Sequence, residues 1–166
     1  MDYLREARIR YREVQSIGRM FQLILWGIPL LIVAVVAYTT RGEPGGTSDA
    51  LTGLLPVVMI LVPVWLIFRR LDITLDDENL AFGFWRFRPV VPLQSIVSAE
   101  PEKITFRKYG GIDIRWVAGA VCYTTRFGEG VRIKVEGRKR DWVFSCNDAP
   151  RLIGLLNEVI VSRPKP

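Results

Sequence analysis

The side chains best suited to chemistry in this sequence are three consecutive cations. Arg138, Lys139 and Arg140 follow Gly137 in the segment GVRIKVEGRKRDWVF, where apolar and charged residues alternate on both sides of the glycine. This alternation about a turn signal predicts a β-hairpin with a basic tip. A cluster of cations can bind anions, such as acidic lipid headgroups or the acidic surface of a partner protein. A tip that is only solvated is the third possibility, and the sequence leaves all three open.

Two further cations belong to the same candidate contact site. The apolar residues of the first hairpin strand occupy alternate positions and face the core, so Arg132 and Lys134 between them face outward beside the tip. In the returning strand the expected buried side chains are Trp142, Phe144 and Cys146, with Asp141 and Val143 on the opposite face. Lipid or partner contacts are therefore expected from the five cations of this hairpin.

Catalytic and metal-binding chemistry lacks its usual residues. The sequence has no histidine, which removes the commonest general base and the commonest metal ligand. The two cysteines, Cys122 and Cys146, lack metal-ligand spacing and are expected to be small buried residues. The carboxylates Asp76, Asp77 and Glu78 are adjacent in a turn signal, so they point in different directions into water. We expect no enzymatic activity, no metal and no cofactor.

Two long apolar segments precede the predicted hairpin and decide where it is placed. Residues 20–38 and 51–68 carry no charge, and each is about long enough to cross a bilayer. A short glycine-rich loop joins them. The sequence therefore predicts a two-helix transmembrane hairpin over residues 20–68. Prolines and glycines inside both segments fit either the ordinary composition of membrane helices or packing on helices of other membrane proteins.

Basic residues flank the predicted spans on one side. Arg19 and four other arginines precede the first span, Arg69 and Arg70 follow the second, and the connecting loop has one arginine. Because Lys and Arg are enriched on the cytoplasmic side, both termini are predicted to be cytoplasmic. Tyr38 and Trp65 are suitable interfacial anchors at the outer and inner ends of the spans. We expect a multi-pass protein of the cell inner (plasma) membrane.

Residues 1–19 are expected to form a cytoplasmic juxtamembrane helix. Leu4, Ile9, Val14 and Ile17 are spaced among charged residues, as in an amphipathic helix. The arm also contains three acidic residues, which disfavour binding to anionic lipid.

From residue 69 onward, short alternating runs separated by turn signals replace the apolar segments. The runs extend from LDITL (71–75) through KITFR (103–107) to RDWVFSC (140–146). Seven or eight such strands predict an antiparallel sandwich or barrel. A single helix closes the chain, capped by Asn147 or Asp148 with Pro150 in its first turn. Its apolar stripe is expected to cover an open end of the strands.

The order of these elements resembles small bacterial membrane proteins that carry two N-terminal spans and a pleckstrin-homology-like (PH-like) domain. The resemblance is carried by the strand IDIRW after Gly110-Gly111, the hairpin GVRIKVEGRKRDWVF and the helix NDAPRLIGLLNEVI. It implies a cytoplasmic PH-like antiparallel barrel of about seven strands over residues 69–166, with one C-terminal capping helix. It also implies binding of lipids, peptides or proteins rather than catalysis. Eukaryotic relatives hold phosphoinositides with basic residues between the first two strands, whereas this sequence has three carboxylates there.

These features favour a non-enzymatic integral membrane protein that presents a PH-like interaction module on the cytoplasmic face. The alternative is a small accessory or structural subunit of a larger membrane complex, whose spans pack on partner helices. The expected partners are membrane lipids, with anionic headgroups at the basic tip, and other membrane proteins. No nucleic acid is expected, because aromatic residues are not interleaved with the exposed cations.

Overall fold

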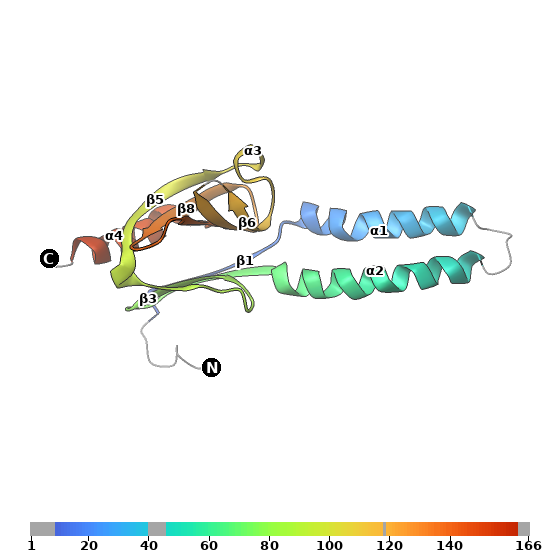
Figure 1. Cartoon of the computed structure of the whole chain (residues 1–166), viewed down its shortest axis with the longest axis horizontal. Helices are drawn as coiled ribbons and strands as arrows, with labels where there is room; N and C mark the ends of the chain where they lie inside the picture. The colour runs from blue at the N-terminus through green and yellow to red at the C-terminus, as the bar shows by residue number, and fades with distance from the viewer. Residues whose placement is uncertain (1–8, 40–45, 118, 163–166) are drawn as a thin grey trace. The chain divides into compact units, whose positions relative to one another are not determined.

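The computed structural model describes residues 9–39, 46–117 and 119–162 (Figure 1). The chain divides into two compact units. Residues 17–69 form one, which we call the helical unit, and residues 1–16 with 70–166 form the other, which we call the β unit.

The helical unit is a pair of helices, α1 (Arg19–Thr39) and α2 (Gly46–Phe68). The Trp26 and Trp65 rings pack edge to face, with their centroids 6.2 Å apart. Among the described residues, one helical stretch, Gln22–Thr39, has the length and composition needed to cross a membrane, with a mean hydropathy of 2.0. The described apolar part of α2, Leu55–Phe68, is shorter.

The first sheet of the β unit is an antiparallel meander in the order β1-β2-β3-β4. Its strands are β1 (Tyr11–Ser16), β2 (Arg70–Leu75), β3 (Asn79–Phe84) and β4 (Val90–Pro92). The helix expected over residues 1–19 is therefore wrong for residues 11–16, and residues 1–8 lie outside the described part. Pairing with β2 satisfies the backbone groups of this segment in place of helical hydrogen bonds.

The second sheet has the order β5-β8-β9-β7-β6. Its strands are β5 (Ile96–Ile104), β6 (Asp113–Val117), β7 (Ala120–Thr124), β8 (Gly128–Val135) and β9 (Asp141–Ser145). The expectation of a purely antiparallel arrangement is wrong here, because β9 inserts between β8 and β7 and so runs parallel to β7. Within the described chain, the strands form two separate sheets that no ladder closes into a barrel.

Two short helices connect the strands. The 3₁₀ helix η1 (Leu93–Ser95) joins the two sheets. The expected strand KITFR is partly wrong, because β5 ends at Ile104 and the next residues form α3 (Phe106–Tyr109). Gly110, at a φ of 75°, ends that turn in the left-handed conformation that glycine adopts without strain.

The two sheets pack face to face through aromatic side chains. Phe82 stacks on Phe144 with their ring centroids 4.5 Å apart and also contacts Tyr123 and Trp142. Trp142 and Phe144 are both buried, which confirms the inward phase expected for the returning hairpin strand. The described structure is thus mainly β, with two sheets and a C-terminal helix.

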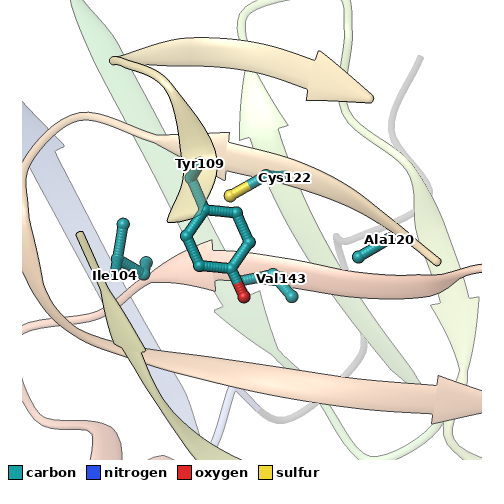
Figure 2. Close-up of a cluster of buried hydrophobic side chains, with 5 residues drawn as sticks. All are labelled: Ile104, Tyr109, Ala120, Cys122 and Val143. Carbon is teal, nitrogen blue, oxygen red and sulfur yellow. The ribbon is translucent and has the colours of Figure 1, made fainter. Parts of the chain in front are cut away.

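The opposite face of β9 is buried as well, and this overturns the expected outward position of Val143. Figure 2 shows Val143 in a second apolar cluster, beneath the ring of Tyr109. Ile104, Ala120 and Cys122 complete this cluster. Because β9 is a central strand and Tyr109 of α3 covers its outer face, both faces of the strand exclude water.

The C-terminal helix α4 (Ala149–Val161) matches the expected position and capping. The Asp148 carboxylate accepts a hydrogen bond of 3.2 Å from the backbone N–H of Arg151. Leu152 and Leu156 are buried where the helix packs against β5 and β8. The amphipathic stripe therefore covers the second sheet.

Candidate functional site

The strand registers distinguish two ends of the β unit. Ser16 pairs with Arg70, and Leu71 pairs with Phe84, so the start of β2 and the β3–β4 turn share one end. We call it the Arg70 end, and the chain continues from it into both helices. At the other end of the first sheet Asn79 pairs with Pro92, and η1 follows directly. We call this second end the Ser95 end, after the last residue of η1.

The basic hairpin tip lies at the Ser95 end. Strand β8 runs back along β5, from the pair Gly128–Ile104 to the pair Val135–Ile96. The next backbone N–H, that of Glu136, donates a 2.8 Å hydrogen bond to the carbonyl oxygen of Ser95. The three tip cations therefore project from the end of the β unit opposite to Arg70.

Aromatic side chains from neighbouring strands form a pocket with these cations. The pocket has a volume of about 330 Å³ and is lined by Trp116, Val121, Tyr123, Arg138, Lys139, Arg140 and Trp142. We call it the tip pocket. Trp116 is 69% exposed, whereas Trp142 and Tyr123 are buried and in ring contact with centroids 5.5 Å apart. The pocket thus has an aromatic side and a charged side of long exposed cations.

The Arg138 side chain connects these two sides. Its guanidinium carbon lies 4.4 Å from the centroid of the Trp142 ring, within the range of a cation–π interaction. Burial raises the pKa of the Tyr123 hydroxyl, an effect that the charge of Arg138 opposes, so the phenol is neutral at physiological pH. The buried indole N–H of Trp142 has no hydrogen-bond partner in the described chain. The pocket therefore combines positive charge with apolar surface.

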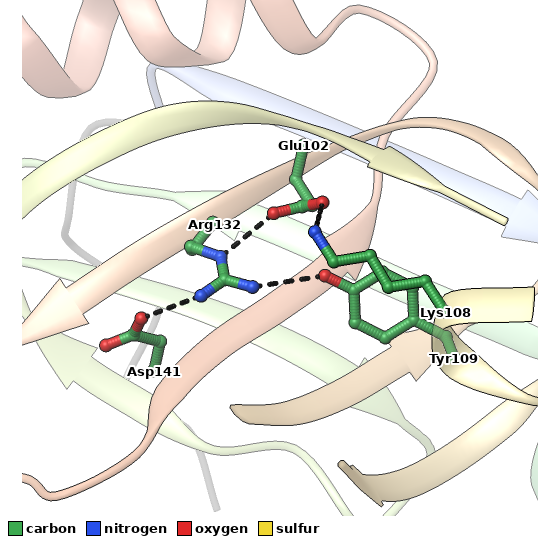
Figure 3. Close-up of polar contacts among 5 residues, drawn as sticks. All are labelled: Glu102, Lys108, Tyr109, Arg132 and Asp141. Carbon is green, nitrogen blue, oxygen red and sulfur yellow. Dashed lines mark hydrogen bonds and ion pairs between the residues drawn. The ribbon is translucent and has the colours of Figure 1, made fainter. Parts of the chain in front are cut away.

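Arg132, expected to be an outward contact residue, is instead held by its own neighbours (Figure 3). Its guanidinium donates to Glu102 at 2.9 Å, to Asp141 at 3.0 Å and to the Tyr109 hydroxyl at 3.2 Å. Lys108 also donates to Glu102, at 2.6 Å. Charge-assisted bonds of this kind fix a side chain, so the network ties β8 to β5, β9 and α3.

The electrostatics of this network agree with a structural role. Burial opposes the charge of Arg132, but the Tyr109 hydroxyl and Glu102 together raise its pKa. Burial likewise opposes the charge of Glu102, and Lys108 and Arg132 outweigh it to lower the pKa of that carboxyl. Lys134 is exposed on β8 and does not line the tip pocket. Of the five expected contact cations, the structure therefore brings together Arg138, Lys139 and Arg140.

The expected membrane-interface residues occupy different environments. Arg19 begins α1, and Tyr38 is exposed near the end of that helix. Trp65 packs against Trp26, and the guanidinium carbon of Arg69 lies 5.3 Å from the Trp65 ring centroid. Arg70 is exposed at the start of β2. Trp65 therefore packs within the helical unit.

The remaining candidates for chemistry are structural. Cys122 and Cys146 are buried as expected, and burial raises the pKa of each thiol to about 12. Asp76, which was expected to point into water, is buried instead. Its carboxylate accepts hydrogen bonds from the backbone N–H groups of Glu78 and Asn79, at 2.8 and 2.5 Å, and so closes the β2–β3 turn. Among the described residues, no three His, Cys, Asp or Glu side chains are grouped to hold a metal.

Sequence reasoning did not identify the aromatic half of the tip pocket. Trp116 lies on β6 and Tyr123 on β7, and the insertion of β9 beside β7 brings both next to the tip. The sequence did contain one sign of this aromatic surface. Trp116 directly follows Arg115 in a predicted strand, and the sequence indicated no contact for this tryptophan.

Comparison of the chain with protein-family models, with curated proteins and with solved structures finds no match. The function is therefore argued from the residues and geometry of the chain itself.

Proposed function

We propose that this protein is a non-enzymatic, membrane-anchored interaction module. In this proposal α1 and α2 cross the cell membrane as a two-span hairpin with both termini in the cytoplasm. The β unit, a PH-like domain, is then cytoplasmic, and its tip pocket binds an acidic segment of a partner protein. Two observations support the two-span helical hairpin. Both helices contain uncharged stretches, and apolar side chains such as Leu31 and Ile60 are exposed along them.

The tip pocket is the single observation that carries the binding role. Three exposed cations stand beside an aromatic wall, and a surface that is both charged and aromatic is typical of protein-recognition sites. The cations would pair with carboxylates, and Trp116 would cover an apolar side chain of the same segment. Arginine and tryptophan are the residues that most often dominate such interfaces.

The position of the pocket favours a protein over the anchoring membrane as the ligand. The chain joins the proposed spans through Ser16 and Arg70, whereas the pocket is at the Ser95 end. The earlier expectation that the tip cations orient the domain on anionic lipid thus becomes the less favoured reading. A cation at the end remote from the anchor is available to a cytoplasmic partner.

Site-specific photo-crosslinking in native membranes tests the proposal. A photoreactive residue at Lys139 of the full chain should yield a discrete protein adduct, and the same residue at Glu158, exposed on α4, serves as the control. Trp116→Ser should remove the adduct at position 139, because it deletes the exposed aromatic wall. Lipid adducts alone at position 139, or the same adducts at both positions, would contradict the proposal.

The same experiment distinguishes the accessory-subunit alternative. In that case a photoreactive residue at Leu31, exposed on α1, should capture the same partner as position 139, in stoichiometric amount. Capture at position 139 without capture at position 31 favours the interaction module.

A further inference from the structure

The Arg70 end of the β unit carries an exposed surface of a different kind. At the β3–β4 turn, Phe84 and Phe87 exchange two backbone hydrogen bonds, of 3.2 and 2.7 Å. Trp85 and Arg86 form the apex between them. Trp85 is 63% exposed and Phe87 is 54% exposed, so two large aromatic rings and a cation project into solvent from a tight turn.

The backbone holds this turn in one shape. Trp85 has a φ of 36°, in a region that bulky residues rarely occupy, and such strain persists only where the surroundings impose it. At Gly83, with a φ of 143°, a Cβ would lie 2.2 Å from the carbonyl oxygen of Phe87. Only glycine permits this close approach, so the backbone of the turn is held in a shape that leaves both rings exposed.

A second aromatic pair lies at the same end. The rings of Phe106 on α3 and Phe127 on the β7–β8 turn pack edge to face, with their centroids 6.0 Å apart, and both are exposed. Thr125, two residues before Phe127, donates a 2.8 Å hydrogen bond to the side chain of Gln15, next to Ser16. Figure 1 shows α3 at the end of the β unit where β2 begins.

Exposed aromatic rings are thus sorted between the two ends. Of the five in the described residues of the β unit, Trp116 lines the tip pocket at the Ser95 end. The other four are at the Arg70 end, and they are Trp85, Phe87, Phe106 and Phe127. We call these four the aromatic end. The exposed cations Arg70, Arg86 and Arg107 accompany them.

We infer that the aromatic end rests in the headgroup region of the phospholipid bilayer that α1 and α2 span. This inference rests on the proposed function, because it requires the two helices to cross a membrane. One residue separates the end of α2 from β2, and two separate β1 from α1. Each extended residue covers at most about 3.6 Å, so these connectors keep the Arg70 end within reach of the helix ends.

The chemistry of the aromatic end fits the membrane interface. Tryptophan is enriched there because its ring has an apolar body and a polar N–H, and phenylalanine packs against the upper acyl chains. Arginine pairs with lipid phosphates through parallel hydrogen bonds. The aromatic rings and cations would therefore set the tilt of the β unit and direct the tip pocket away from the bilayer.

Fluorescence quenching on the full chain in phosphatidylcholine–phosphatidylglycerol vesicles tests this inference. An environment-sensitive NBD fluorophore is attached to Phe87→Cys, and separately to Phe106→Cys as a second probe, since the native cysteines are buried. Lys139→Cys reports the tip, and Val35→Cys reports the proposed span. Quenchers are a lipid that carries a nitroxide near its headgroup and aqueous iodide.

Labels at positions 87 and 106 should emit at shorter wavelength than the label at 139, lose fluorescence to the nitroxide lipid and resist iodide. The label at 139 should show the reverse. If iodide quenches 87 and 106 as strongly as 139 while the label at 35 is shielded, the spanning hairpin stands and the lipid-contact inference is overturned. Shielding at 87 without quenching by the nitroxide lipid would identify a protein contact and also overturn it. If iodide reaches the label at 35, the spanning hairpin and the inference both fall.

Discussion

The backbone N–H of Glu136 and the carbonyl oxygen of Ser95 are joined by a hydrogen bond of 2.8 Å. This contact fixes the β8–β9 turn to the end of the first sheet that is farthest from Arg70. The tip pocket and the aromatic end are consequently separate surfaces that use different residues. Variants of one surface are therefore expected to leave the other intact.

The first prediction concerns topology. A reporter fused after Pro166 should behave as cytoplasmic, and one inserted between residues 45 and 46 should behave as external, because arginines flank the helical unit on the side of both termini. Alkaline phosphatase and fluorescent-protein fusions measure this. The opposite pattern would exclude a cytoplasmic β unit.

The second prediction concerns the tip cations. Replacing Arg138 and Arg140 by serine should abolish partner crosslinking at a photoreactive residue placed at Lys139, and should leave membrane localisation unchanged because the proposed spans provide the anchor. Raising the salt concentration should weaken crosslinking of the unmodified chain, since exposed charges are screened beyond about 8–10 Å. Lys134→Ser is the matched control: it removes an exposed cation from the same hairpin but outside the pocket. Equal losses from both changes would mean that net charge, and not the pocket, determines binding.

The third prediction concerns the core between the sheets. Trp142→Ala should lower the free energy of unfolding by about 3–5 kcal/mol, as truncations of large buried aromatics do, because the ring packs against Phe82 and Tyr123. Urea denaturation of the full chain in mild detergent measures the loss. Trp116→Ala, which truncates an exposed tryptophan, should change it by less than about 0.5 kcal/mol. Similar losses for the two variants would contradict the packing described.

The fourth prediction concerns β1. The Gln15 side-chain oxygen accepts hydrogen bonds from Thr125 and Ser145, at 2.8 and 2.9 Å, and its NH₂ group donates to the Ser145 carbonyl at 3.0 Å. Gln15→Ala would leave these buried groups without their partner, so it should cost about 1–3 kcal/mol of unfolding free energy. Val14→Ala, on the exposed face of the same strand, is the control and should be nearly neutral. A fragment that begins at Leu71 lacks β1, and its β unit should be less stable than that of the full chain, which retains β1.

The fifth prediction concerns pH. Burial opposes the charge of Glu13, but hydrogen bonds from the Tyr11 hydroxyl, the Asn147 backbone and the Gln15 side chain outweigh it and lower the carboxyl pKa below its usual 4.5. A lowered folded-state pKa stabilises the fold above the unfolded-state value, and that stabilisation is lost as pH falls through the folded-state value. Glu13→Gln should therefore lower stability at pH 7, and its difference from the unmodified chain should shrink below pH 4.5. Urea midpoints at both pH values provide the measurement, and a pH-independent difference would contradict the assigned cause.

The inward phase of the basic hairpin and the position of α4 followed from the sequence alone. Val131, Ile133 and Trp142 are buried as their alternation predicts, because the side-chain period of a strand is a local property of the backbone. Helix α4 could also be predicted from the sequence, because its cap and its apolar stripe lie within one segment. Predicting these features does not require knowing which residues pack against them on the other side of the core.

Strand β1 was missed because its inward side chains are polar. Tyr11, Glu13 and Gln15 alternate toward the second sheet, and their partners lie more than a hundred residues later in the chain. A strand whose buried face is hydrogen-bonded rather than apolar has no hydrophobic period to read. Its assignment depends on contacts that exist only in the folded protein.

The sequence by itself determined the three tip cations, the apolar helices and the phase of the strands beside them. The tertiary structure alone decided what those cations face. Insertion of β9 between β8 and β7 placed Trp116 and Tyr123 beside Arg138, and the path of β5 placed the tip at the opposite end from Arg70. Strand order and chain crossing arise from packing between distant segments, and neither side-chain period nor local charge encodes them.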